Sequence, residues 1–269
     1  MVSREEIFNV VKETVISSIA VYAKNKKKRE HNFQILDLII PEEREIRSVV
    51  GGMETSIGTT LWEPLAKAIA KLNGFEVLDQ KLLSPSIMPS RLDGILQTLI
   101  EDRNHKQNTA DQCHANIKEV CQIFLHKPIN DFMPAPKGSG IDVWLYKDGV
   151  NYFFDTKTVQ PNIADYRRYF EQLLKWYAFF YAKNPDQNAF ARIVFPYNPY
   201  REKDFWLNTK NKGFPLEPYN EGWVQNDFWD FCSGLEDTYS IIYEAFVNIA
   251  TSGELKDILK DVFYNDSSK

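Results

Sequence analysis

Residues 140–157 constrain the fold of this chain more than any other segment, because they predict a β-hairpin of fixed register. Two runs rich in β-branched and aromatic residues flank the pair Asp148-Gly149, a strong signal for a two-residue hairpin turn. If these two residues form the turn, counting outward along both strands places Asp142 opposite Asp155. The sequence therefore predicts that two carboxylates are direct neighbours across the hairpin.

This carboxylate pair predicts a cation site. Opposed residues on antiparallel strands have Cβ atoms about 4.5–5.5 Å apart, and Lys157, two residues beyond Asp155, shares the same face. Two like charges at this distance destabilise a hairpin unless a cation compensates them. Carboxylate oxygens are the ligands that Mg²⁺ prefers, so we expect Mg²⁺ between Asp142 and Asp155. An exposed hairpin with ordinary surface charges is the alternative, and the apolar residues on both faces argue against it.

The composition indicates a folded protein from a reducing compartment. The chain has 269 residues, of which 43% are hydrophobic and 14% aromatic, enough to bury a sizeable core. Its three cysteines are an odd number and do not suggest a disulfide framework. Because we find neither a signal pattern nor an apolar run of about 20 residues, we expect a cytoplasmic protein without a membrane segment. The net charge of −5 argues against an indiscriminate nucleic-acid coat protein.

The order of predicted elements indicates an α/β fold with a mixed central β-sheet flanked by helices. Expected helices lie near residues 3–25, 41–52, 59–73, 90–104, 109–125 and 164–182, with two more after about 236. Strands are expected near 75–79 and 189–195 beside the hairpin, whereas 127–140 and 197–225 look like loops. We expect one domain over residues 1–269, with a helical N-terminal part at about 1–130, a catalytic core at about 55–205 and a helical C-terminal part at about 226–264. The basic run at 24–29 reads as a solvated helix end or as a contact with DNA phosphates.

The hairpin resembles the signature of the PD-(D/E)xK nucleases. That signature has an acid on one strand and acid-x-lysine on the next, here Asp142 followed by Asp155-Thr156-Lys157, with Ile141 in place of the usual proline. Acid-x-lysine also occurs at 79–81 and 254–256, but only the middle copy has an aspartate matched across a turn. The predicted order of elements also fits the αβββαβ core of this superfamily, here with extra N- and C-terminal helices.

Longer segments resemble the TdeIII-like type II restriction endonucleases. These segments are residues 47–63, 155–162 and 195–200. The resemblance implies a bacterial or archaeal enzyme that hydrolyses phosphodiester bonds at a specific double-stranded DNA site, of the GGNCC type, in a system with a cognate DNA methyltransferase. Since type II enzymes that cut symmetric sites usually act as twofold dimers, we expect a homodimer.

In the mechanism that this resemblance implies, Asp142 and Asp155 hold Mg²⁺ while Lys157 orients or helps to deprotonate the attacking water. The main-chain carbonyl of Thr156 is a further ligand by resemblance to the superfamily. Glu63 is a candidate for an additional acidic ligand or a supporting group. Its alternative is an ordinary first-turn glutamate favoured by the helix dipole.

Several polar and basic residues in loops are candidates for contacts with DNA. The first two belong to a glycine-containing loop that could approach a phosphate, and the last three to a loop rich in side chains that read guanine and adenine edges. For each of them an ordinary loop residue is the alternative. The candidates are Lys137, Ser139, Gln160, Asn162, Asn198, Arg201 and Lys203.

Two other functions stay open at this point. A repair or recombination nuclease of the same superfamily would share the triad, and a non-catalytic DNA-binding module would lack an intact one. Cys113-His114 with Cys121 and His126 could suggest zinc, but the spacing lacks a CxxC knuckle. We therefore expect these side chains to serve packing.

Overall fold

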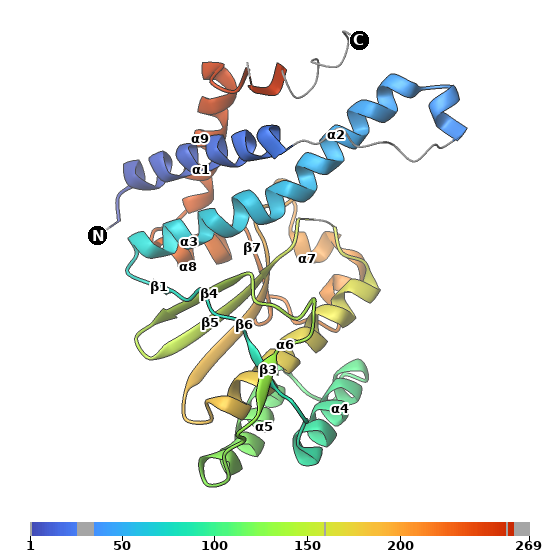
Figure 1. The fold of residues 1–269 in the computed structure, drawn as a ribbon, viewed down its shortest axis with the longest axis vertical. Helices are drawn as coiled ribbons and strands as arrows, with labels where there is room; N and C mark the ends of the chain where they lie inside the picture. Colours follow the sequence, from blue (N-terminus) through green and yellow to red (C-terminus); the bar gives the residue numbers. More distant parts are fainter. Residues whose placement is uncertain (1, 26–34, 159, 257, 261–269) are drawn as a thin grey trace.

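A five-stranded mixed sheet lies at the centre of the computed structural model, which describes residues 2–25, 35–158, 160–256 and 258–260 (Figure 1). The strand order is β1-β4-β5-β6-β7. The strands β1, β4 and β5 pair antiparallel, and β5, β6 and β7 pair parallel. The α/β fold with a mixed central sheet is therefore confirmed. The strands are β1 (Glu76–Val77), β4 (Val143–Lys147), β5 (Val150–Thr156), β6 (Asn188–Phe195) and β7 (Gly222–Val224).

The hairpin of β4 and β5 has the expected register. Its five paired positions run from Lys147↔Val150 to Val143↔Phe154. Asp148 and Gly149 both have positive φ angles, 51° and 81°. This is the conformation of a type I′ turn, which asparagine, aspartate and glycine adopt at low cost.

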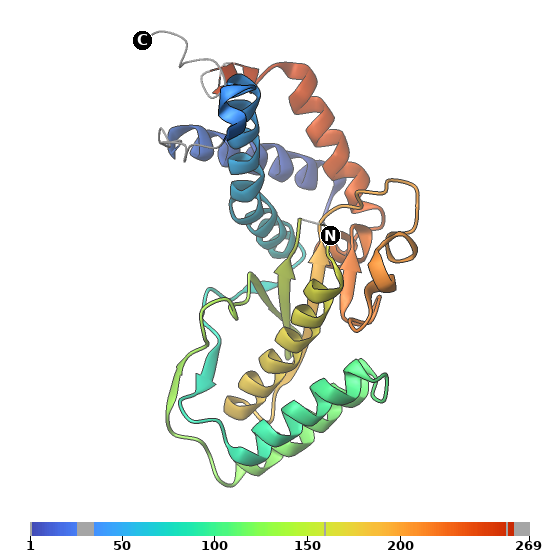
Figure 2. The ribbon, with the colours of Figure 1, turned by 90° about the vertical axis from the view of Figure 1, so that its right-hand side faces the viewer.

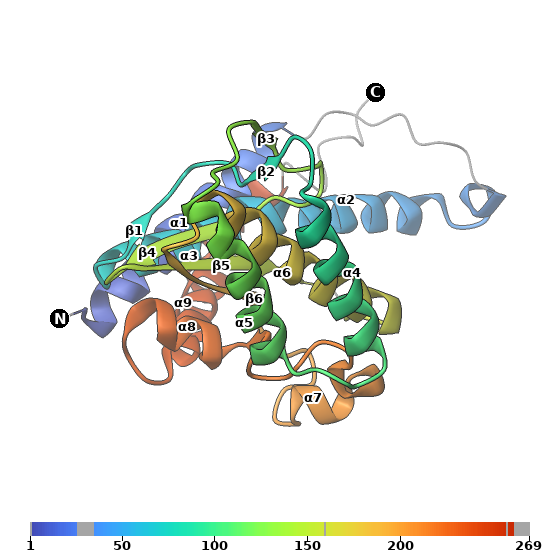
Figure 3. The same cartoon turned by 90° about the horizontal axis from the view of Figure 1, so that it is seen from below.

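Helices cover both faces of the sheet and form two cores (Figure 2). On one face α6 (Ile163–Lys183) packs against the sheet, and α4 (Ser90–Asn104) and α5 (Ala110–Cys121) pack on α6, as the view in Figure 3 also shows. Phe153 belongs to this first core and its neighbour Phe154 to the second, as side-chain alternation along a strand requires. The second core is covered by α1 (Arg4–Asn25), α3 (Glu63–Leu72), α8 (Asn226–Ser233) and α9 (Thr238–Ser252).

The segment from Pro41 to Leu72 forms one continuous helix that projects beyond the body at its α2 end (Figure 1). It consists of α2 (Pro41–Ile57), the π-helical turn η2 (Gly58–Trp62) and α3. The expected helix end at Gly51-Gly52 is therefore wrong. Gly52 packs closely against α1, since a Cβ atom there would lie 3.0 Å from the hydroxyl of Tyr22. Tertiary packing outweighs the low helix propensity of glycine here.

The widened turn η2 has a local cause. The hydroxyl of Thr60 donates to the carbonyl oxygen of Ser56 at 2.8 Å, and the hydroxyl of Thr59 donates to the same oxygen at 3.2 Å. Side-chain hydroxyls that occupy a helical carbonyl disturb the regular main-chain ladder. Single π turns are frequent at functional sites, and Glu63 follows this one directly.

Two expected loops contain short elements. Within 127–140, β3 (Phe132–Pro134) pairs with β2 (Leu83–Pro85) in a second, two-stranded sheet. Within 197–225 lie α7 (Phe205–Asn208) and the edge strand β7. These strands have only three residues each, too few to show a periodic pattern. Single-turn segments complete the fold at η1 (Ile35–Leu38), η3 (Gln122–Leu125) and η4 (Lys210–Gly213).

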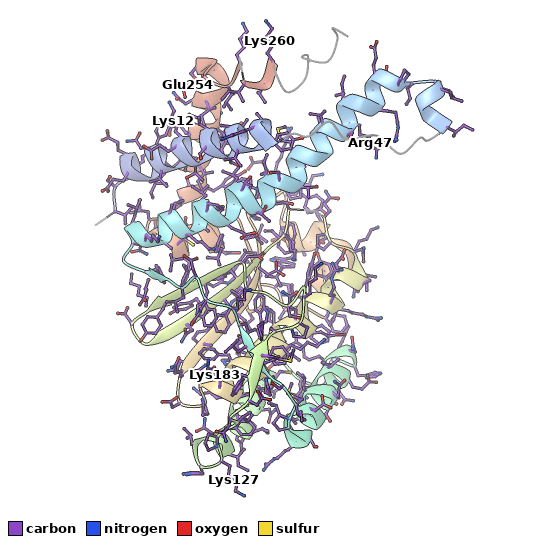
Figure 4. All side chains as sticks on the ribbon, viewed as in Figure 1. Lys12, Arg47, Lys127, Lys183, Glu254 and Lys260 are labelled. Atoms are coloured by element: carbon purple, nitrogen blue, oxygen red, sulfur yellow. The ribbon has the colours of Figure 1, made fainter. Side chains whose placement is uncertain are left out.

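The terminal helices pack on one another. Lys12 of α1 and Glu254, which follows α9, form an ion pair of 3.0 Å and are labelled in Figure 4. The first C-terminal helix, α8, begins at Asn226, earlier than the expected start near 236. Residues 26–29 of the basic run lie outside the described residues. In the part of the chain that the structure describes, no helix is long and apolar enough to cross a membrane.

Candidate functional site

The start of β4 and the end of β5 bring the predicted triad together. Asp142 directly precedes β4, and Asp155 is the penultimate residue of β5. By strand alternation Asp142 has the orientation of Trp144 and Asp155 that of Phe153, and both aromatic residues belong to the core beneath α6. The two carboxylates therefore lie on the α6 face of the sheet, as the register predicted.

The regular hairpin ladder gives way to side-chain contacts at Asp142. The amide of Asp142 donates to the carbonyl oxygen of Phe154 at 3.1 Å. Its carboxylate oxygen Oδ2 accepts the amide of Thr156 at 2.9 Å and the Thr156 hydroxyl at 3.3 Å. The Asp142 side chain thus takes the place of a main-chain acceptor and is held beside the end of β5.

Asp155 is buried, with 3% of its surface exposed. Its Oδ1 accepts a hydrogen bond from Nζ of Lys157 at 2.6 Å, and its Oδ2 accepts one from Nε2 of Gln172 at 2.8 Å. Burial raises the pKa of the Asp155 carboxyl above its usual range, the ammonium of Lys157 opposes this shift and the charge of Asp142 reinforces it. The contact with Gln172 was not expected, because an amide in the middle of a helical pattern gives no sequence signal.

Glu63 also lies within the electrostatic range of the two aspartates. It is half-buried at the start of α3, on the opposite helical layer from α6. Burial raises the pKa of Glu63 to about 7, with Asp142 and Asp155 adding to the rise and Lys67 and Lys157 opposing it. The structure therefore brings Asp142, Asp155 and Lys157 into contact, and the charges of all three act on Glu63.

The donor chemistry of this cluster fits a hard divalent cation. Among the described residues, no group of three or more His, Cys, Asp and Glu side chains is placed to hold a metal ion. The cluster instead offers the carboxylates of Asp142 and Asp155 next to the main chain at Thr156, and Mg²⁺ typically binds to only one or two carboxylates. The mutual repulsion that contributes to the raised pKa values of Asp155 and Glu63 is the imbalance that a cation would relieve.

Two of the expected DNA-contacting amides have structural partners. Asn162 caps α6, because its side-chain oxygen accepts two amide hydrogen bonds from the first turn of that helix. The side-chain amide of Asn198 donates to the carbonyl oxygens of Arg201 and Lys203 at 3.1 and 2.8 Å. Asn162 therefore stabilises the start of α6, and Asn198 stabilises its own loop.

The other candidates for DNA contacts lie at the surface. Lys137, Gln160, Arg201 and Lys203 are exposed. Ser139 is partly buried, and its carbonyl oxygen accepts a hydrogen bond from the indole of Trp176. These four exposed side chains are accessible to a ligand such as DNA. The main chain of Ser139, in contrast, is hydrogen-bonded to α6 through Trp176.

The cysteine and histidine residues of the 113–121 segment are part of the packing. Cys113 and Cys121 are fully buried in the first core. The ring of His114 stacks on Tyr177 at a centroid distance of 4.1 Å, and its Nε2 lies 2.7 Å from the hydroxyl of Tyr181. This agrees with the expectation of a packing role for these three residues, whereas His126, which was expected to pack as well, is exposed.

Comparison with known protein families gives a match over most of the chain. The family model described as HinfI, a type II restriction endonuclease, matches residues 3–250. Neither the curated proteins nor the solved structures include a significant match. The matched residues contain the complete central sheet and the whole candidate site.

Proposed function

Because the chain belongs to the HinfI family of type II restriction endonucleases, we propose that it cleaves double-stranded DNA through Asp142, Asp155 and Lys157. The enzyme class follows from the family and confirms the expectation of a type II site-specific nuclease. The residue assignment is supported above all by one observation, the buried Asp155 paired with Lys157 beside Asp142 at the end of the hairpin.

In this proposal Asp142 and Asp155, with the carbonyl of Thr156, would hold Mg²⁺. When bound, the ion supplies positive charge against the negative charge that develops on the phosphate and the leaving oxygen. The Lys157 side chain is 26% exposed, and its ammonium group is held by Asp155. There it can donate a hydrogen bond that orients the attacking water. Glu63 adds negative charge from the other helical layer and supports the cation site.

The narrower assignments belong to the proposal as well. The PD-(D/E)xK assignment is supported by the contacts of the triad and by the order α3, β1, β4, β5, α6, β6 in the structure. The TdeIII-like resemblance and the GGNCC-type target are further proposals, and the HinfI family match does not extend to them. The GGNCC-type target rests on the TdeIII-like resemblance, and the fragment ends described below identify the site.

A homodimer and a cognate DNA methyltransferase complete the proposed system. A symmetric site presents the same half-site on each strand, which two copies of one active centre can cut together. The methyltransferase would protect host DNA without a stable complex with the nuclease. Sedimentation of the protein alone and with cognate DNA tests the dimer, and a monomer under both conditions would contradict it.

The decisive experiment is digestion of unmodified phage DNA by the purified protein in Mg²⁺, followed by sequencing of the fragment ends. We expect all ends to share one short sequence. Ends at many unrelated sequences, or cutting confined to branched or damaged DNA, would instead support a repair or recombination nuclease. Binding without cutting would support a DNA-binding module.

Single substitutions test the residues. Asp142→Ala, Asp155→Ala and Lys157→Ala should each slow cleavage by about 10²-fold or more, as expected for the loss of a group that acts on the reacting atoms. DNA binding in Ca²⁺ should persist, because phosphate and base contacts come from other parts of the surface. The matched control is Asp79→Ala, in another acid-x-lysine copy, whose side chain is 78% exposed and lies 3.7 Å from Lys67. Slow cleavage by the control, or normal cleavage by the Asp155 variant, would contradict the assignment.

A further inference from the structure

Side chains on one face of α6 contact the candidate catalytic residues. Tyr169 and Gln172 are three residues apart and therefore neighbours on the helix surface. Nζ of Lys157 lies 5.5 Å from the centre of the Tyr169 ring, and Nε2 of Gln172 donates to Oδ2 of Asp155 at 2.8 Å. Lys157 and Asp155 are thus contacted by two neighbouring residues of one helix face, Tyr169 and Gln172.

The same face also anchors the loop that leads to the triad. Trp176, one further turn along α6, donates from its indole nitrogen to the carbonyl oxygen of Ser139 at 2.8 Å. Ser139 lies three residues before Asp142. Trp176 is fully buried, so this face of α6 is held firmly in the first core.

Of these contacts, the hydrogen bond from Gln172 acts directly on the charged carboxylate of Asp155. Both carboxylate oxygens of Asp155 have a donor, Lys157 on Oδ1 and Gln172 on Oδ2. With 3% of Asp155 exposed, water cannot easily replace a lost donor, and an unsatisfied buried acceptor is costly. An amide orients the carboxylate through a hydrogen bond without neutralising it. A lysine or arginine in the same place would compete with a bound cation.

We propose that Gln172 is a positioning residue that fixes the orientation of the Asp155 carboxylate for cation binding. This inference rests on the proposed function, because it assigns to Asp155 the role of a cation ligand. Loss of a group that hydrogen-bonds to a metal-ligating side chain typically lowers metal affinity or activity by about 10–100-fold. The side chain of Gln172 acts through Asp155 and has no direct part in the chemical step.

Two variants remove the contact in different ways. Gln172→Met keeps the length and unbranched shape of the side chain and removes the donor, whereas Gln172→Asn keeps the amide and withdraws it by one methylene group. The matched control is Glu171→Gln, the adjacent residue, whose partly exposed carboxylate pairs with Lys175 at 3.8 Å. Circular dichroism and thermal melting establish that each variant is folded, and either of the two variants suffices for the test.

The measurements are the Mg²⁺ dependence of single-turnover cleavage and the binding of Ca²⁺ to the protein alone by calorimetry. We expect both Gln172 variants to need about 10-fold more Mg²⁺ for half-maximal cleavage and to bind Ca²⁺ about 10-fold more weakly. The control should match the wild type in both. A variant that cuts more slowly at every Mg²⁺ concentration, with unchanged half-saturation and unchanged Ca²⁺ affinity, would show a structural role only and overturn the proposal.

The outcome is separable from that of the proposed function. If the wild type does not cut, or if Asp155→Ala cuts normally, the proposed catalytic role fails. If the wild type cuts, Asp155→Ala does not, and the Gln172 variants keep wild-type metal dependence, only the present inference fails.

Discussion

Replacement of Glu63 by glutamine isolates the effect of one negative charge on the stability of the metal-free protein. Burial and the nearby aspartates raise the pKa of Glu63 from 4.5 to about 7 in the folded state. Between these two values the folded chain keeps a proton that the unfolded chain has lost. The wild type must therefore lose stability as the pH rises through this window.

The size of this loss follows from the same two values. At about 1.4 kcal/mol for each pH unit, the shift corresponds to about 3 kcal/mol. Because Glu63 is only half-buried, solvent screening reduces the expected effect to about 1–2 kcal/mol. Glutamine has the shape of the protonated side chain and carries no charge. Glu63→Gln should accordingly be more stable than the wild type by about 1–2 kcal/mol at about pH 8.5, and equally stable at about pH 4.5.

Urea denaturation in EDTA, followed by tryptophan fluorescence at several pH values, measures this difference. Glu54→Gln is the matched control, because Glu54 is an exposed glutamate on the same continuous helix. We expect the control to follow the wild type at every pH. Equal stability of Glu63→Gln and wild type at about pH 8.5, or a gain that does not shrink toward acid pH, would refute the reasoning.

Two further predictions concern a buried arginine and a partly buried histidine away from the site. Arg103→Met should lower the free energy of unfolding by about 3–5 kcal/mol, because it leaves the buried carboxylate of Glu221, now 2.5 and 3.0 Å from the guanidinium, without its partner. Urea denaturation measures the loss, and a second substitution, Glu221→Met, should restore much of it. Burial lowers the pKa of His114 to about 4 from 6.5, so the wild type should lose stability as the pH falls from 6.5 toward 4. His114→Phe should show a weaker dependence over this range, and an unchanged slope would count against it.

The parts of the fold that local sequence determines were predicted correctly. The turn pair Asp148-Gly149 sets the hairpin register, since a two-residue type I′ turn allows only one pairing. The helix expected at 164–182 follows from a long apolar periodicity, and the structure has it at Ile163–Lys183. Its capping residue, Asn162, was expected to contact DNA instead. These signals lie within the segments that they describe.

The errors arose where distant contacts decide the local structure. Gly51-Gly52 resembles a helix stop, yet the helix continues there and packs against α1, where the Tyr22 hydroxyl lies 3.0 Å from the position of a Gly52 Cβ atom. The strand β7 has three residues and exists through its pairing with β6. No pattern within either segment reveals its partner.

The same contrast between local and distant contacts applies to the residues of the candidate site. Asp142, Asp155 and Lys157 were predicted because a hairpin brings them together within a short stretch of chain. Glu63 was suggested by the resemblance of its segment to a family, and the effect of the two aspartates on its pKa became visible only in the structure. Gln172 was missed, because its contact depends on how α6 docks onto the sheet.

This division has a consequence for the order in which the site assembles during folding. The hairpin closes over a short loop and can form within microseconds, whereas the docking of α3 and α6 onto opposite faces joins parts of the chain that are far apart and is slower. A nascent chain with only the hairpin formed holds two carboxylates without Gln172 on one side or Glu63 on the other. The Gln172 hydrogen bond and the charge of Glu63 therefore reach the hairpin carboxylates only once α6 and α3 have docked onto the sheet.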